Sequence, residues 1–217
     1  MATLTRDGEI FVLDLGDDEN RLNDQSIAEI AAALDEVAEA EGPRALVTTG
    51  RGKFFSNGLD LEWLGAHQEQ WKPFIDATHQ MLARLLSLPV PTAVAIQGHA
   101  FAAGAMFTLA HDWAVMRADR GFWCLPEVDI GLPFTPGMDA LIGSRLGRRT
   151  AHEAITTGRR YGGPEAREAG IVDAIAAEGE ELPAAMERLA ALTTKAGPTL
   201  GTIKETFHAW ALQALRG

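Results

Sequence analysis

The chain has 217 residues, of which 47% are hydrophobic and 23% are charged, as is ordinary for one globular domain with a sizeable core. The net charge of −11, with lysines and arginines scattered along the chain, argues against a nucleic-acid-binding surface, although a few basic groups could still hold a small polyanion. Cys124 is the only cysteine, and neither a signal peptide nor a membrane-spanning stretch is visible, so we expect a soluble cytoplasmic protein without disulfides.

The first half of the chain alternates short apolar strands with amphipathic helices. An Asp7-Gly8 turn between two alternating segments predicts a hairpin. Asn23 can cap a helix whose apolar residues recur every three or four positions until Gly42-Pro43 ends it. Four more elements are expected here: a buried strand at 45–49, a glycine-rich loop at 50–60, a helix from 71 to 85 and a strand at 92–96.

The second half continues this alternation, and no linker marks a separate domain. Its expected elements are strands at 112–116, 122–124 and 171–175, and helices at 138–146, 150–157, from Pro164, at 182–193 and at 198–215. Strands that alternate with helices predict an α/β fold.

The stretch 98–104 follows the strand at 92–96, and five of its seven residues are glycine or alanine. An apolar helical turn comes next, so the amides near Ala103 and Gly104 would lie at a helix N-terminus. Such N–H groups suit an oxygen that gains negative charge. About twenty residues on, Glu127 is the one carboxylate in an apolar run. An isolated acid near an amide cradle is the arrangement needed for carbanion chemistry beside a carbonyl group.

The segments Phe55–Leu61, Gly98–Gly104 and Pro126-Glu127, in this order and spacing, resemble the crotonase (enoyl-CoA hydratase/isomerase) superfamily. The resemblance runs from about Ile10 to Ile175 and is greatest to the short Δ3-Δ2-enoyl-CoA isomerases of the plant peroxisomal type. It implies an α/β crotonase (ClpP-like) spiral of ββα units, with a core domain at 1–195 and a C-terminal helix at 196–217 that covers the site or contacts another subunit. It also implies a homotrimer or a dimer of trimers, an acyl-CoA thioester as substrate, and no metal or separate cofactor.

The resemblance also assigns roles to individual residues. Glu127 becomes the single catalytic acid/base, and the backbone amides of Asn57 and Ala103 become the oxyanion hole. The expected substrate-binding residues are Ser56, Gly58, Leu59, Asp60, Gly104 and Met106. Hydratases of the family carry a second glutamate at the position of Met106, and a thioether cannot exchange a proton.

The loss of that second acid favours an isomerase that shifts a 3-enoyl-CoA double bond to the 2-trans position. Two alternatives stay open. One is hydration or another crotonase reaction in which Asp129 or a water replaces the missing glutamate, and the other is a protein that binds acyl-CoA without catalysis.

Overall fold

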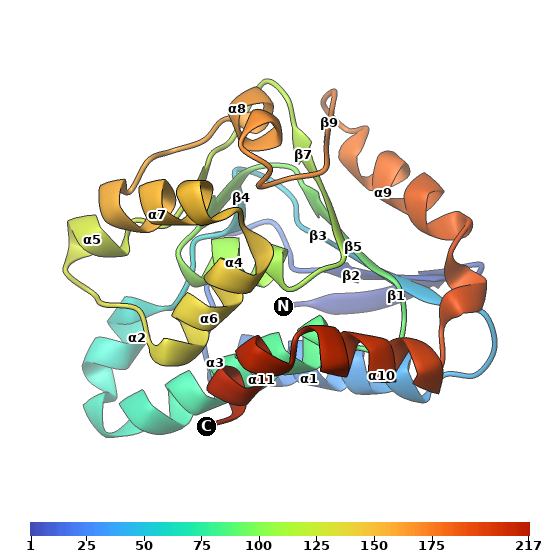
Figure 1. The fold of residues 1–217 in the computed structure, drawn as a ribbon, viewed down its shortest axis with the longest axis horizontal. Coiled ribbons are helices and arrows are strands. Elements are labelled where there is room, and N and C mark those ends of the chain that lie inside the picture. Colours follow the sequence, from blue (N-terminus) through green and yellow to red (C-terminus); the bar gives the residue numbers. More distant parts are fainter.

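The computed structural model describes all 217 residues, and its strands form two sheets (Figure 1). The large sheet has the order β1-β2-β3-β5-β7-β9, and only the hairpin pair β1 and β2 is antiparallel. Its strands are β1 (Thr3–Asp7), β2 (Ile10–Asp14), β3 (Ala45–Thr49), β5 (Thr92–Ile96), β7 (Trp113–Arg117) and β9 (Ala174–Ala176). The small parallel sheet consists of β4 (Phe54–Ser56), β6 (His99–Phe101) and β8 (Trp123–Cys124).

The chain builds these sheets by a repeated ββα path. From β3 to α5, each turn of the path adds one strand to the large sheet, the next strand to the small sheet, and then a helix. The helices that follow the small-sheet strands are α2 (Leu61–Ala66), α4 (Ala103–Leu109) and α5 (Glu127–Ile130). Because β4, β6 and β8 are parallel, the segments that follow them meet at one edge of the small sheet.

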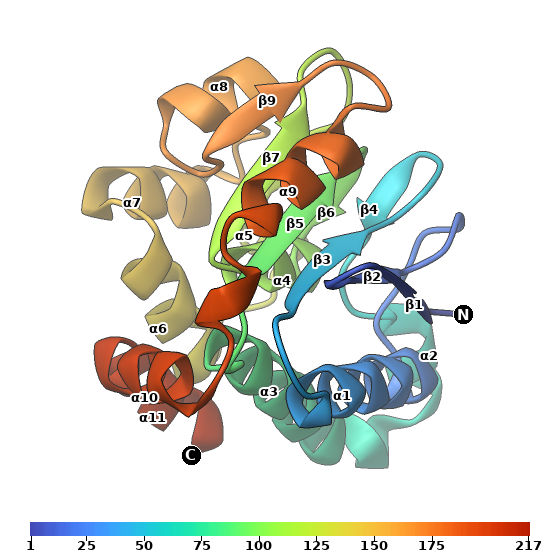
Figure 2. The same cartoon turned by 90° about the vertical axis from the view of Figure 1, so that its right-hand side faces the viewer.

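Helices cover both faces of the large sheet (Figure 2). Helix α9 (Glu181–Ala190) lies against one face, where it packs on Val47 and Ala95. The alternate positions Leu46 and Val94 point the other way, into the main core. The remaining helices are α1 (Asp24–Glu39), η1 (Gln68–Gln70), α3 (Trp71–Leu86), α6 (Pro136–Arg145), α7 (Arg148–Thr157), α8 (Gly163–Glu168), η2 (Thr193–Lys195), α10 (Pro198–Phe207) and α11 (Ala209–Arg216).

The single C-terminal helix predicted at 198–215 is wrong, because the chain bends at His208 into α10 and α11. Lys204 anchors α10, since its Nζ donates to the Val90 carbonyl and to Asp112 Oδ2 at 2.8 and 2.7 Å. Helix α11 then turns its buried residues Leu212 and Leu215 toward the core and packs on α3 and α6. The bend lets α10 and α11 satisfy these two different contacts.

Candidate active site

A cavity of about 470 Å³ opens at the edge where β4, β6 and β8 end. Residues that follow all three strands line it, together with residues of α3, α6 and the segment between α5 and α6. Its lining residues are Arg21, Asn57, Leu59, Leu61, Trp71, Ile75, Phe101, Ala102, Ala103, Met106, Pro126, Glu127, Ile130, Leu132, Pro133, Phe134, Thr135 and Met138. Glu127 is the only acidic residue among them, and most of the others are apolar.

Glu127 is the first residue of α5 and is only 7% exposed. Strand β8 ends at Cys124, and the helical turn α5 follows after two intervening residues. The Oε2 atom of Glu127 is buried without a hydrogen-bond partner. Burial raises the pKa of the carboxyl group to about 7, because the charged form loses its hydration. A carboxyl group with this pKa can both take and return a proton near neutral pH.

Two backbone amides beside this acid have no acceptor within the protein. Ala103 begins α4, so its N–H group lies in the first turn, where no intrahelical acceptor exists. Leu59 lies opposite Leu22 in an isolated parallel bridge, in which Leu22 bonds to the Gly58 carbonyl and to the Asp60 amide. In such a bridge the middle residue directs its own N–H away from the partner strand. Leu59 and Ala103 both line the cavity.

The predicted oxyanion donor at Asn57 is wrong. Its N–H group donates to the Glu19 carbonyl at 2.9 Å, and its side-chain Nδ2 donates to Glu19 Oε2 at 3.0 Å. Both bonds hold the loop after β4 against the loop after β2. The unoccupied amide of this loop belongs to Leu59, two residues further along the chain.

Two glycines allow the loops after β4 and β6 to touch backbone to backbone. Gly58 has a φ of +81°, and a Cβ atom there would lie 2.9 Å from the Ala102 Cβ and 3.3 Å from the Ala103 nitrogen. A Cβ atom on Gly104 would lie 2.5 Å from the Ser56 carbonyl oxygen. This close approach brings the amides of Leu59 and Ala103 to one wall of the cavity.

Several residues that were predicted to bind substrate shape these loops and do not line the cavity. The Ser56 hydroxyl donates to the Asn20 carbonyl at 2.7 Å, and Gly58 and Gly104 allow the close packing. Asp60 caps α2 by accepting the Trp63 amide at 3.1 Å. Leu59 and Met106 do line the cavity, and Met106 is almost fully buried. Asp129 lies outside it: a Cβ atom on Gly158, at the end of α7, would lie 2.5 Å from Asp129 Oδ2.

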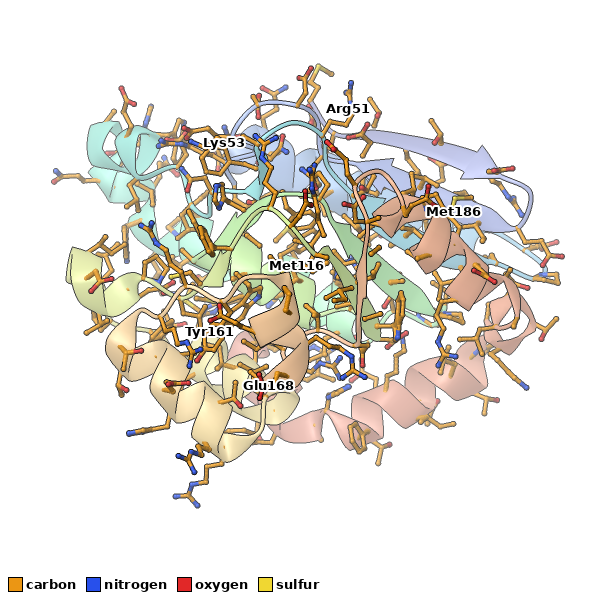
Figure 3. All side chains as sticks on the ribbon, turned by 90° about the horizontal axis from the view of Figure 1, so that it is seen from above. Arg51, Lys53, Met116, Tyr161, Glu168 and Met186 are labelled. Atoms are coloured by element: carbon orange, nitrogen blue, oxygen red, sulfur yellow. The ribbon has the colours of Figure 1, made fainter.

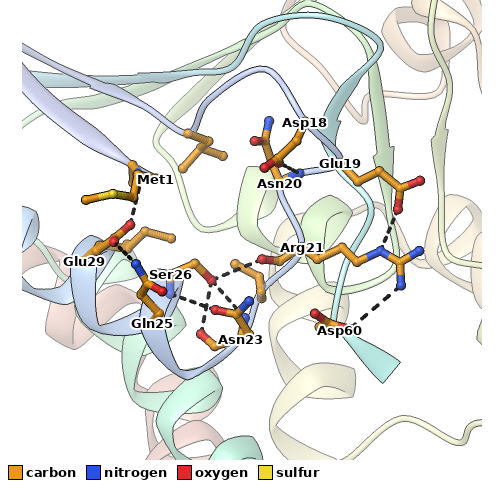
Figure 4. Close-up of a pocket in the computed structure, with 14 residues that line it drawn as sticks. Met1, Asp18, Glu19, Asn20, Arg21, Asn23, Gln25, Ser26, Glu29 and Asp60 are labelled. Atoms are coloured by element: carbon orange, nitrogen blue, oxygen red, sulfur yellow. Dashed lines mark hydrogen bonds and ion pairs between the residues drawn. The ribbon is translucent and has the colours of Figure 1, made fainter. Parts of the chain in front are cut away.

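Arg21 was missed by the sequence analysis, because nothing in its polar loop distinguishes it from its neighbours. It lies between the active-site cavity and a second, polar cavity of about 480 Å³ (Figure 4). Its Nε donates to Glu19 Oε2 at 2.6 Å, and its Nη1 lies 3.9 Å from Asp60 Oδ1. The charge of Arg21 is therefore balanced within the protein.

No group of three or more histidine, cysteine, aspartate or glutamate side chains is arranged so that it could hold a metal ion. None of the helices has the length and apolar character needed to cross a bilayer.

The chain is similar in sequence to known proteins. The family model described as enoyl-CoA hydratase/isomerase matches residues 6–216. Enoyl-CoA delta isomerase 3 of Arabidopsis thaliana is 41% identical over 191 residues, which cover 83% of this chain and 79% of that protein. A putative enoyl-CoA hydratase of Thermus thermophilus is 35% identical over 203 residues, which cover 88% of this chain and 77% of that protein.

The structural comparison agrees with the sequence comparison. The solved structure of an enoyl-CoA isomerase of Mycobacterium tuberculosis matches with a TM-score of 0.91 at 28% identity, covering 99% of this chain and 94% of that one. The predicted crotonase fold is thereby confirmed. With a family model that spans nearly the whole chain, this protein belongs to the enoyl-CoA hydratase/isomerase family of enzymes.

Proposed function

We propose that the protein is a Δ3-Δ2-enoyl-CoA isomerase that uses Glu127 as its single acid and base. The observation that carries this proposal is the cavity lining, in which Glu127 is the only acidic side chain and Met106 lies on the neighbouring helix α4. Isomerisation needs one group that moves one proton, whereas hydration also needs groups that hold and activate a water. The relatives named enoyl-CoA delta isomerases support the same choice.

The reaction proceeds in two proton transfers. Glu127 removes a proton from carbon 2 of a 3-enoyl thioester, and the electrons of the broken C–H bond delocalise onto the carbonyl oxygen and carbon 4. The protonated Glu127 then returns this proton to carbon 4, and the double bond forms between carbons 2 and 3. A carboxyl pKa of about 7 suits both steps, because the group is neither a strong acid nor a strong base at neutral pH.

The amides of Leu59 and Ala103 stabilise the negative oxygen of the dienolate. Both N–H groups lack acceptors in the protein and line the same cavity as Glu127. Fixed donors at the position where charge develops lower the energy of the transition state more than that of the substrate. The apolar wall formed by Ile75, Phe134 and Met138 offers a contact surface for the acyl chain.

The test is a comparison of two reactions in the same buffer. We expect rapid conversion of 3-hexenoyl-CoA to the 2-trans thioester and hydration of crotonyl-CoA that is slower by orders of magnitude. Glu127→Gln keeps the shape of the side chain and removes the base, so isomerisation should fall by about 10²–10⁴. Asp129→Asn, which removes a neighbouring acid outside the cavity, is the matched control and should keep the wild-type rate.

Hydration as fast as isomerisation would contradict the proposal, as would a Glu127→Gln variant that retains most of its activity. Tight binding of both thioesters without turnover of either would identify an acyl-CoA-binding protein instead.

We further infer that the protein assembles as a homotrimer or a dimer of trimers. Three large apolar side chains on consecutive turns of α10 and α11 support this: Ile203, Phe207 and Trp210 are 57%, 78% and 60% exposed. A cluster of exposed apolar side chains of this kind is typical of an interaction surface.

A further inference from the structure

Another cavity, of about 720 Å³, lies between the helices α3, α6 and α11. Its lining includes His79 of α3, Pro136 and Gly137 of α6, and Trp210 and Leu215 of α11. Figure 1 and Figure 2 both show α3 and α6 beside α11, near the C-terminus of the chain. We call this space the C-terminal cavity. It lies behind the apolar wall of the active-site cavity, because α3 and α6 contribute residues to both.

One hydrogen bond lies at the boundary between the two cavities. Thr135 lines the active-site cavity and His79 lines the C-terminal cavity, and the Thr135 Oγ1 atom lies 2.7 Å from His79 Nε2. On α3, Ile75 and His79 are one turn apart, and the first faces the active-site cavity while the second faces the C-terminal cavity. At the start of α6 the same change occurs between Thr135 and Gly137. The bonded pair therefore separates the two cavities.

Thr135 is held in place from two sides. It is the N-cap of α6, and its Oγ1 accepts the Met138 amide at 3.2 Å. The bond with His79 ties this cap to α3, 56 residues earlier in the chain. Met138 and the neighbouring Phe134 belong to the apolar wall of the active-site cavity. The position of this wall therefore depends on the bond between α3 and the start of α6.

The His79 ring suits the end of an apolar cavity. The side chain is half-buried, and this burial lowers its pKa, although the nearby Asp76 carboxylate opposes the shift. The imidazole is therefore neutral at pH 7, so an acyl chain can lie against it without leaving a charge unsolvated. Asp76 is paired with Lys72 at 2.6 Å on the exposed side of α3.

We propose that His79 is a specificity-determining residue, which closes the acyl end of the active-site cavity through its bond to Thr135. This inference rests on the proposed function, which supplies an acyl thioester that reacts at Glu127. The thioester and the acyl chain share a cavity of about 470 Å³, so a chain that reaches Thr135 cannot extend further while His79 is in place. A longer chain would need the C-terminal cavity, and the closed boundary therefore selects shorter chains.

The test measures binding, so that it does not depend on turnover. Calorimetry would give the Kd of hexanoyl-CoA and of decanoyl-CoA, which differ only in the length of the acyl chain. His79→Ala removes the ring, and α3 should still form because alanine has the highest helix propensity. His79→Gln is the conservative variant, since its amide can reach Thr135. The matched control is Met186→Ala, which shortens another half-buried side chain on α9, against the other face of the large sheet (Figure 3).

We expect the wild type to bind decanoyl-CoA no more tightly than hexanoyl-CoA, because the additional methylene groups find no apolar surface. In His79→Ala the ratio of the hexanoyl-CoA Kd to the decanoyl-CoA Kd should rise about tenfold, which corresponds to the burial of about two further methylene groups. The ratio should keep its wild-type value in His79→Gln and in Met186→Ala. A purely structural role of His79 would weaken the binding of both ligands alike and leave the ratio unchanged.

Three outcomes would overturn the inference: a wild type that already binds decanoyl-CoA much more tightly, an unchanged ratio in His79→Ala, or an equal rise of the ratio in Met186→Ala. If circular dichroism shows that His79→Ala does not fold, His79→Ser is measured in its place under the same criteria. Failure of the proposed function is distinct from these outcomes. A protein that shows the expected Kd ratios but does not isomerise 3-hexenoyl-CoA would keep His79 as the limit on chain length and lose the isomerase assignment.

Discussion

At Glu127, burial of the carboxyl group affects both the proposed catalytic role and the stability of the fold. The carboxyl group is 7% exposed and its Oε2 has no hydrogen-bond partner, so its ionised form is poorly solvated in the folded protein. Burial raises the folded-state pKa to about 7 from an ordinary value of 4.5. The group therefore stabilises the fold fully below pH 4.5, and this contribution is lost as the pH rises through 7.

The raised pKa of Glu127 predicts a pH dependence of both activity and stability. The kcat/KM for 3-hexenoyl-CoA should rise with pH around a midpoint near 7, because only the ionised carboxylate can remove the proton. Over the same range, Glu127→Gln should gain stability relative to the wild type, by about 1–3 kcal/mol in the free energy of unfolding between pH 5 and pH 8. Urea unfolding at the two pH values measures this difference. A difference that stays constant with pH would mean that Glu127 titrates normally.

The proposed oxyanion hole depends on two single N–H groups, those of Leu59 and Ala103. Replacing a residue by its α-hydroxy analogue converts the amide to an ester and removes one N–H group with little change in shape. At Leu59 or Ala103 we expect kcat to fall by about 10²–10³. At Asn57 the same change should lower stability, because it removes the bond to the Glu19 carbonyl, but should leave kcat close to that of the wild type. If the Asn57 ester lost activity and the Leu59 ester did not, the original assignment would be restored.

At the scale of elements, the C-terminal helices support the wall of the cavity from behind. Helix α11 packs on α3 and α6, and these two helices contribute Ile75 and Met138 to the cavity. Lys204 holds the preceding helix α10 through the Val90 carbonyl and Asp112 Oδ2. Its ammonium group is buried, whereas the Asp112 side chain is 35% exposed.

This difference in exposure sets the expected effect of Lys204→Met. The methionine keeps the apolar part of the side chain. The Asp112 carboxylate is partly exposed, so water can hydrate it once its partner is removed. The loss of stability should therefore equal that of the charged hydrogen bonds of Lys204, and should be smaller than the cost of leaving a fully buried charge unpaired. We expect a loss of about 2–3 kcal/mol in the free energy of unfolding, measured by urea denaturation. Lys195→Met, at an exposed lysine in η2 without a hydrogen bond, is the control. Equal stability of the two variants would mean that α10 is not anchored by Lys204.

Local patterns predicted most of the elements but not their contacts. The hairpin at Asp7-Gly8, the Asn23 cap and the buried strands depend on turn chemistry and periodicity, which neighbouring residues carry. The bend at His208 was not predicted, and the contacts made on its two sides are with distant residues, such as that of Lys204 with Asp112, 92 residues earlier in the chain. The choice between the amides of Asn57 and Leu59 depends in the same way on contacts with Glu19 and Leu22.

At the scale of the whole molecule, the family resemblance predicted the crotonase spiral. It also predicted that the segments Phe55–Leu61, Gly98–Gly104 and Pro126-Glu127 contribute to one site. Hydrophobic periodicity alone would have indicated neither. Of the residues that the resemblance assigned to the site, Glu127, Ala103, Leu59 and Met106 line the cavity. The position of Arg21 at the cavity was not predicted, since only the fold brings the loop after β2 to the loops after β4 and β6.

The exposed apolar side chains of α10 and α11 predict that copies of the chain assemble through this surface. Phe207 is 78% exposed, and its burial between copies of the chain would remove a large apolar surface from water. We expect the wild type to sediment as a multiple of the 23.3 kDa chain, and Phe207→Glu to shift it toward the monomer, because a charge in an apolar contact is poorly solvated.

Ile175→Glu is the control for that shift, since Ile175 is 42% exposed on the edge strand β9, away from these helices in the sequence. It adds the same charge to an apolar surface residue and should leave the assembly intact. Analytical ultracentrifugation of the three proteins at one concentration measures the masses. A wild type that sediments as a monomer would refute assembly. An unchanged mass for Phe207→Glu beside a multimeric wild type would place the contact elsewhere, and the exposed residues of α10 and α11 would then be free for another partner.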